Sequence, residues 1–190
     1  MAFLFTVTEK TVFPNNETLL IYPFKDIWER DKTKDKHYAI EEFAYIEFMS
    51  SMKKTNPYRQ YKKELKETKI IQAVITKPNW TPDGLIKAGI DKIIEFQREA
   101  STTYNYYMAV KRAAEKMQDF FMDVDINERH PKSGNLIYKP KDVTGAMGDT
   151  EKVLSNLKSL EKKVEEELYE STKNRSNKEI SFFADPESLN

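Results

Sequence analysis

The stretch that decides the fold is residues 24–61, FKDIWERDKTKDKHYAIEEFAYIEFMSSMKKTNPYRQY. Within it, residues 37–52 predict a helix whose apolar side chains cover most of the circumference. Only Glu41, Glu42 and Glu47 are left to form a solvated stripe. A helix this apolar needs more than one packing neighbour. We therefore expect it to be buried at the centre of the fold or between subunits.

Length and composition limit the classes of protein to consider. A chain of 190 residues suits one domain, or one domain with long arms. Its 31 basic and 31 acidic residues balance, so no net charge attracts nucleic acid or an anionic membrane. The absence of cysteine excludes disulfides and thiolate chemistry. No apolar stretch approaches the roughly 18 residues of a membrane span, so we expect no membrane partner.

The first residues are typical of strands. Apolar and polar residues alternate over residues 3–8, and a second apolar run occupies residues 19–22, with the turn-forming Pro14-Asn15-Asn16 between them. We expect a hairpin arm over residues 1–23. A lone two-stranded ribbon is marginally stable, so it must pack on the helices or add to a neighbour's sheet.

Several further helices are expected. Thr81-Pro82-Asp83 is typical of a helix start, with a capping hydroxyl, a proline at the first helical position and an acid in the first turn. The other helices are expected at residues 25–30, 61–75 and 149–170.

A heptad repeat is the clearest periodic signal. It indicates one helix over residues 82–124, about 60 Å long at the usual rise. The alternative is a break near Ser101-Thr102-Thr103, because three residues of modest helix propensity adjoin there. One row of the repeat is Ile86, Ile93, Ala100, Tyr107, Ala114 and Phe121, and the other is Gly89, Phe96, Thr103, Val110, Met117 and Val124.

Residues 125–150 contain prolines and glycines without helical periodicity, which predicts a long loop with a small hairpin near Gly134-Asn135. Residues 171–190 predict a flexible tail in which Phe182 and Phe183 form an aromatic anchor. The expected fold is thus mainly α. It is an elongated helical bundle over residues 24–170, with one long central helix, the N-terminal arm and the tail.

Motifs for catalysis, metal or cofactor binding are missing. His37 and His130 lie in no metal-binding pattern. The sequence that begins at Asp123 opens like a calcium loop but lacks its glycine and its final glutamate. Gly145-Ala-Met-Gly148 lacks the lysine and serine of a phosphate-binding loop. We expect a non-enzymatic protein without metal or cofactor.

Residues 53–63 combine lysines and an arginine with Tyr58 and Tyr61. Such a stretch can follow a nucleic-acid backbone while bases stack on the rings. A solvated helix start is the other interpretation, since acids follow at once. Tyr104, Tyr106 and Tyr107 predict packing in a core or interface.

Residues 24–61 resemble the opening region of small structural proteins of tailed bacteriophages, including crAss-like and other large phages. The resemblance rests on the Ile27-Trp28 turn, the Arg30-Asp31-Lys32 trio, the aromatic helix around residues 42–48 and the Asn56-Pro57-Tyr58 stop. The long helix, the glycine-bearing loop and the second helix are similar to head–tail connector proteins, which are mainly helical.

The resemblance implies a virion subunit that forms a ring on the portal and contacts portal and tail or neck proteins through arms or loops. Arg30, Asp31 and Lys32 are expected either to form an inter-subunit salt-bridge cluster or to be a plain exposed charge run. The other function to consider is a helical nucleic-acid-binding or regulatory protein, and a third is a packaged internal virion protein. The interaction candidates are Trp28, Arg30, Asp31, Lys32, Tyr45, Phe48, Pro57, Tyr58, Tyr104, Tyr107, Phe182 and Phe183.

Overall fold

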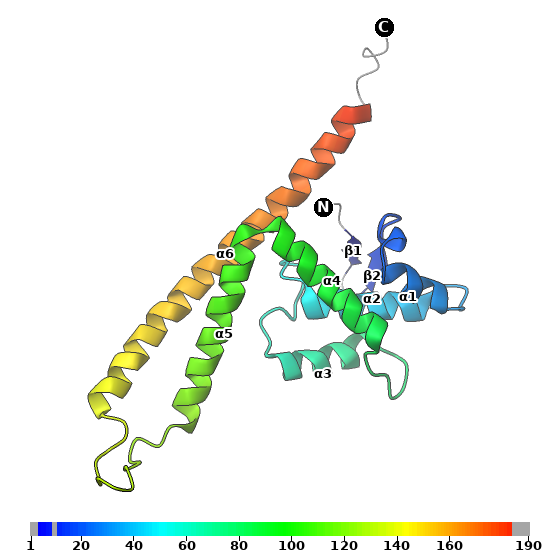
Figure 1. The fold of residues 1–190 in the computed structure, drawn as a ribbon. Coiled ribbons are helices and arrows are strands. Elements are labelled where there is room, and N and C mark those ends of the chain that lie inside the picture. The colour runs from blue at the N-terminus through cyan, green and yellow to red at the C-terminus, as the bar shows by residue number, and fades with distance from the viewer. Residues whose placement is uncertain (1–3, 9–10, 184–190) are drawn as a thin grey trace. The chain divides into compact units, whose positions relative to one another are not determined.

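The computed structural model describes residues 4–8 and 11–183, with the side chains of residue 64 and of residues 171–183 left out. This part of the chain is mainly helical, with a small antiparallel sheet of two strands near the N-terminus (Figure 1). The elements are β1 (Phe5–Thr8), β2 (Thr11–Pro14), a 3-10 turn (Thr18–Leu20), α1 (Phe24–Arg30), α2 (His37–Ser50), α3 (Lys63–Val74), α4 (Gly84–Ala100), α5 (Thr102–Asp123) and α6 (Pro140–Phe183).

The chain divides into two units. The first comprises Met1–Ser101 with Glu165–Asn190 and contains the hydrophobic core. The second comprises Thr102–Val164 and is a hairpin of α5 and the first part of α6 (Figure 1). The expected elongated bundle around one long helix is not confirmed.

Helix α2 is the centre of the first unit, as its composition predicts. It contacts β2, α1, α3 and α4, and Phe43, Ile46 and Phe48 are buried completely or nearly so. Full burial of each such side chain stabilises the fold by about 1.5–3 kcal/mol. The expected solvated stripe is wrong at Glu47, which is 2% exposed. The buried Glu47 carboxylate lies 3.8 Å from the Lys53 ammonium, so an ion pair accompanies its burial.

The N-terminal hairpin is present, but its second strand lies earlier than expected. β2 is Thr11–Pro14, whose β-branched and aromatic residues pair with β1 so that Val12 lies opposite Val7. The expected strand at 19–22 is wrong, because Leu19 and Leu20 lie in the 3-10 turn. Phe5 and Val12 belong to the core, so the strands pack on their own helices and do not form a separate arm.

The heptad region is two helices, and the break falls where the alternative interpretation placed it. Ser101, which separates α4 from α5, is extended (φ −135°, ψ 118°). Its amide still donates to the Gln97 carbonyl at 3.0 Å, and its hydroxyl donates to Glu167 Oε2 at 2.7 Å. The hydroxyl of Ser101 is thus hydrogen-bonded to a residue outside its own helix, and such side-chain bonds compete with regular helix geometry. At the start of α4 the N-cap is Asp83, whose carboxylate accepts from the Ile86 amide, and not Thr81.

The C-terminal boundaries also differ from expectation. α6 begins at Pro140, so the loop between the last two helices is residues 124–139 and not 125–150. The small hairpin near Gly134 is present as a bridge between Arg129 and Leu136. α6 continues to Phe183, beyond the expected end at residue 170. The anchor expected of Phe182 and Phe183 concerns side chains outside the described residues.

Candidate assembly surface

Arg30, the last residue of α1, links two other elements of its own unit. Its guanidinium donates to Glu42 Oε2 of α2 at 2.7 Å and also pairs with Asp83 before α4. Partial desolvation works to lower the pKa of Arg30, but the bonds to Glu42 and Asp83 outweigh it and raise that pKa. Arg30 thus finds its partners inside the chain, as a bridge between helices.

Asp31 caps α2 from outside the helix. It is 7% exposed, and its carboxylate accepts from the Ala39 amide at 3.0 Å and from the Thr33 amide and hydroxyl at 2.8 and 2.7 Å. Burial works to raise the pKa of Asp31, but these hydrogen bonds hold it below its ordinary value. Lys32 is exposed and donates to the Glu29 carbonyl at 2.7 Å. Of the trio, Lys32 alone resembles a plain surface charge.

The trio lines a cleft of about 730 Å³ that also includes Trp80. The carboxylates around the cleft are engaged. Glu41 accepts from the Thr76 amide and hydroxyl at 3.1 and 2.7 Å, and Glu42 accepts from the Trp80 indole at 3.3 Å as well as from Arg30. The arrangement joins helix ends, and Arg30, Glu41 and Glu42 all find partners within the chain.

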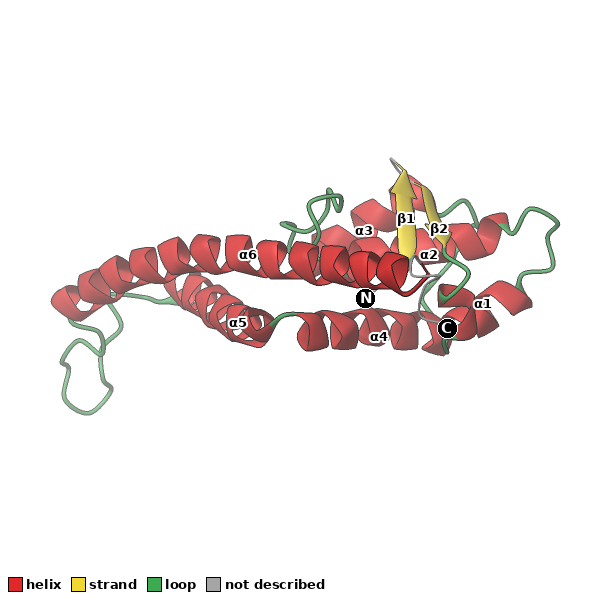
Figure 2. Ribbon diagram, turned by 90° about the horizontal axis from the view of Figure 1, so that it is seen from above, coloured by secondary structure: helices red, strands yellow, loops and turns green. Residues whose placement is uncertain are grey.

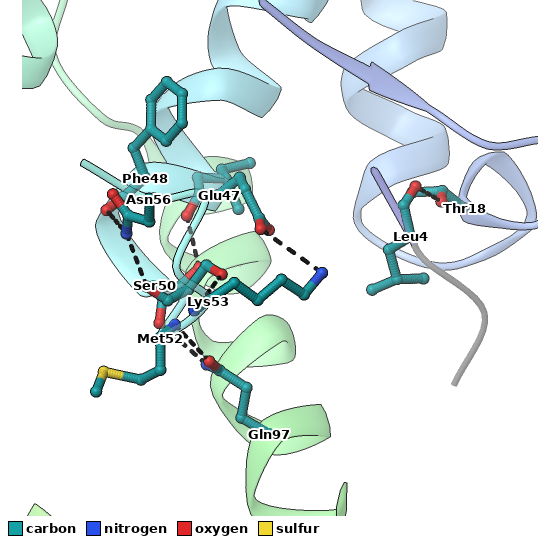
Figure 3. A network of polar contacts seen from close by, with 11 residues as sticks. Leu4, Thr18, Glu47, Phe48, Ser50, Met52, Lys53, Asn56 and Gln97 are labelled. Carbon is teal, nitrogen blue, oxygen red and sulfur yellow. Dashed lines mark hydrogen bonds and ion pairs between the residues drawn. The ribbon is translucent and has the colours of Figure 1, made fainter. Parts of the chain in front are cut away.

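The Asn56-Pro57-Tyr58 stop has a structural explanation (Figure 3). The Asn56 amide donates to the carbonyls of Phe48 and Ser51 at 2.8 and 2.7 Å, and its oxygen accepts from the Tyr58 amide at 2.9 Å. Carbonyls at a helix C-terminus lack partners within the helix. Asn56 therefore supplies the end of α2 with side-chain hydrogen bonds, while Pro57 is exposed.

Gln97 of α4 completes this polar junction (Figure 3). Its Oε1 accepts from the Met52 amide at 2.8 Å, and its Nε2 donates to the Ser50 carbonyl at 3.0 Å. A buried polar side chain that satisfies two buried backbone groups fixes the position of α4 against the end of α2. The contacts of residues 50–58 therefore hold α2 and α4 together within the first unit.

The aromatic interaction candidates on α1 and α2 are packed inside the first unit. Trp28 stacks on Phe43 with ring centroids 6.2 Å apart, and Phe48 contacts Tyr58 at 5.5 Å. Tyr45 is buried, and its hydroxyl donates to Glu67 at 3.2 Å. Desolvation, followed by the nearby Glu67 charge and the hydrogen bond to it, raises the pKa of Tyr45 well above its ordinary range.

Three of the five cations in the basic stretch 53–63 form ion pairs within the first unit. Lys53 pairs with Glu47, while Lys54 and Arg59 both pair with Glu165 of α6, Lys54 at 3.5 Å. Cations held by carboxylates are less able to neutralise phosphates.

The second unit has little buried surface. Of the expected interaction candidates, Tyr104 and Tyr107 are buried on α5 at 2% and 4% exposure. Among its other residues, the structure classes as buried only Ala114 on α5 and Val164 at the end of this part of α6. A two-helix hairpin lacks the apolar area to bury a core of its own.

Sequence reasoning missed the exposed apolar residues of this hairpin. Four such residues are Tyr106, for which the sequence predicts packing, and Phe120, Met147 and Leu154, to which it assigns no role. They are 63%, 41%, 53% and 48% exposed, respectively. A signal was present in the sequence, since Tyr106 and Phe120 are two heptads apart and Met147 and Leu154 are one heptad apart. A second heptad row beside the first marks a helix with more than one neighbour.

Within the described residues no group of three or more acidic or histidine side chains is arranged to hold a metal ion. None of the helices in the described part of the chain combines the length and apolarity needed to span a membrane. No family model, curated protein or solved structure matches the chain.

Proposed function

We propose that this protein is a non-enzymatic structural subunit that assembles with copies of itself into a ring, as part of the head–tail connector of a phage virion. The observation that carries the proposal is the second unit, residues 102–164, whose helices leave large apolar side chains exposed in the single chain. Exposed apolar residues at heptad spacing are typical of helices that pack against further helices.

The phage part of the proposal rests on the resemblance of residues 24–61 to structural proteins of tailed phages. The contacts of that segment are consistent with a scaffold role, because Arg30, Asp31 and Asn56 all bond within their own unit. The proposal assigns self-assembly to the hairpin and not to exchange of the N-terminal strands, since Phe5 and Val12 are buried in the core of their own chain.

Portal and tail or neck proteins are the other proposed partners, with the virion as the final location. The loop of residues 124–139, at the free end of the hairpin, is the segment we assign to them. Most of its side chains are exposed, and Ile126 and Ile137 are 51% and 43% exposed. Ring formation would present one such loop from each copy.

The first test is the mass of the purified protein by light scattering over a range of protein and salt concentrations. The proposal predicts a defined closed multimer, expected near a dozen copies, that electron microscopy shows as a ring. A protein that stays monomeric at every concentration, and binds DNA or RNA with a strong salt dependence, would instead support the nucleic-acid-binding function.

A further inference from the structure

Helix α5 carries an inner row, Tyr107, Ala114 and Phe121, and an outer apolar row, Tyr106, Ala113 and Phe120, on one side of it. Tyr106, Ala113 and Phe120 each precede by one position the residues Tyr107, Ala114 and Phe121, which are buried or half-buried. All three are exposed. Val110, Met117 and Val124 lie between the two rows and are half-buried. The outer row is therefore a second heptad seam on the same helix.

The outer row of α6 sits on the other side of its inner row. Met147 and Leu154 each follow by one position Ala146 and Val153, which are half-buried. Both outer residues are exposed. α6 thus also carries a second seam. On α6 each outer residue follows an inner residue by one position, whereas on α5 each outer residue precedes one.

This difference places the two outer rows on opposite faces of the hairpin. α5 and the first part of α6 run antiparallel and side by side (Figures 1 and 2). In an antiparallel pair a two-fold axis relates the helices, so equivalent heptad positions lie on the same face. The position before the inner row on one helix and the position after it on the other therefore point to opposite faces.

We propose that the outer row of α5 in one copy packs against the outer row of α6 in the next copy. This inference rests on the self-assembly proposed above and identifies its contact. Two different surfaces meet at each contact, so the contact is heterologous and repeats around a ring. The α5 of one copy and the α6 of the next are again antiparallel. The contact between copies therefore has the same helix pairing as the hairpin within each copy.

The register of this contact follows from interlocking heptads. We infer layers that pair Phe121 with Ala146 and Ala114 with Val153. These layers would place the outer residues Phe120 and Met147 at one level, with Ala113 and Leu154 one heptad away. The bridge between Arg129 and Leu136 in the connecting loop continues this antiparallel register within two residues.

Charge complementarity supports a second copy as the occupant. In the same register Lys116, at the outer edge of α5, lies level with Glu151, at the outer edge of α6. Both side chains are exposed, and no ion pair within the described residues engages either. Copies in contact would bring this lysine and this glutamate together beside the apolar row.

Cysteine cross-linking tests the contact, because the natural chain contains no cysteine. The double variant Phe120→Cys/Met147→Cys, oxidised with copper phenanthroline, is expected to give a ladder of covalent multimers on a non-reducing gel. A disulfide needs Cα atoms within about 7 Å, and opposite faces of one hairpin keep the two cysteines of one chain apart. The ladder must therefore come from contacts between copies.

Matched variants separate this contact from the alternatives. Ala113→Cys/Met147→Cys is out of register by one heptad and should give less than about a tenth of the ladder, since one heptad spans roughly 10 Å. Phe120→Cys alone should give only the single-chain band on the non-reducing gel. A strong dimer from Phe120→Cys alone would overturn the heterologous contact in favour of a two-fold one.

Light scattering of the reduced protein distinguishes failure of this inference from failure of the proposed function. A defined multimer without a ladder would overturn the α5–α6 contact and leave ring assembly standing. A monomer without a ladder would overturn both.

A charge exchange adds a second readout. Lys116→Glu is expected to weaken association about threefold to tenfold, and Glu151→Lys in the same chain is expected to restore it.

Discussion

Gly89 of α4 lies against Ile46 of α2 with no room for a side chain. A β-carbon at position 89 would be 2.8 Å from Ile46 Cδ1 and 3.4 Å from Phe24 Cε1. Ile46 and Phe24 are both completely buried, so neither can move aside without disturbing the core. The glycine therefore sets how closely the two helices approach.

We predict that Gly89→Ala destabilises the protein although alanine is the better helix former. Overpacking costs about 1–3 kcal/mol, while the gain in helix propensity is at most about 1 kcal/mol. Gly145→Ala is the matched control, because a β-carbon there meets nothing within 4 Å. The control should gain up to about 1 kcal/mol in urea unfolding. Equal gains in both variants would show that α2 and α4 are not in close contact.

Asn56→Ala should cost about 1–3 kcal/mol, because it leaves the buried carbonyls at the end of α2 without their side-chain donor. Asn105→Ala, at an exposed position of α5, should change stability by less than about 0.7 kcal/mol. Chemical denaturation of both variants measures the difference. A loss at Asn56 no larger than that at Asn105 would refute the capping role.

Arg30 and Lys32 should differ in the same assay. Arg30→Met removes two charged hydrogen bonds that link α1 to Glu42 and Asp83, at a cost of about 1–2 kcal/mol. Lys32→Met removes an exposed contact and should cost less than about 0.5 kcal/mol. Light scattering should give the same multimer for both variants. Loss of the multimer in Lys32→Met would restore the inter-subunit role for this trio.

Stability should fall in acid through Asp31 and Asp83. The native pKa of each carboxyl lies below its ordinary value, since hydrogen bonds outweigh the opposing effect of burial. Their stabilisation is therefore present above about pH 4 and is lost as the pH falls through the lowered native pKa values. Asp31→Asn should be less stable at pH 7 and should lose less stability between pH 4 and pH 2. An unchanged acid slope would contradict the assignment.

The sequence predicted the first unit better than the second because apolar periodicity is strong where side chains are buried. The composition of α2 indicated its central place, and the row that includes Ile86 and Ile93 is buried as expected. The helix break at Ser101 was only one of two interpretations of the sequence. The Ser101 hydroxyl donates to Glu167, which lies far away in the sequence. Local propensity alone cannot reveal such a partner.

The sequence could not separate core residues from surface residues among the aromatic interaction candidates, for a related reason. Large aromatic residues such as Tyr45 and Phe48 are equally suited to a core and to an interface, and only the three-dimensional packing shows that they are buried. The exposed residues of the hairpin follow a heptad of their own, but the more regular inner row beside it dominates the pattern. A search for a second heptad row, one position before or after the first, would have identified Phe120 and Leu154.

A mixing experiment tests the central claim most directly. Ala113→Glu places a charge in the outer row of α5, and Leu154→Glu places one in the outer row of α6. Each variant alone should be monomeric by light scattering with unchanged helical circular dichroism, since both positions are exposed in the single chain. The first variant keeps an intact α6 row and the second keeps an intact α5 row. These two intact rows fit each other, so an equimolar mixture should form a one-to-one dimer and nothing larger. A mixture that stays monomeric, or either variant assembling alone, would contradict the heterologous contact.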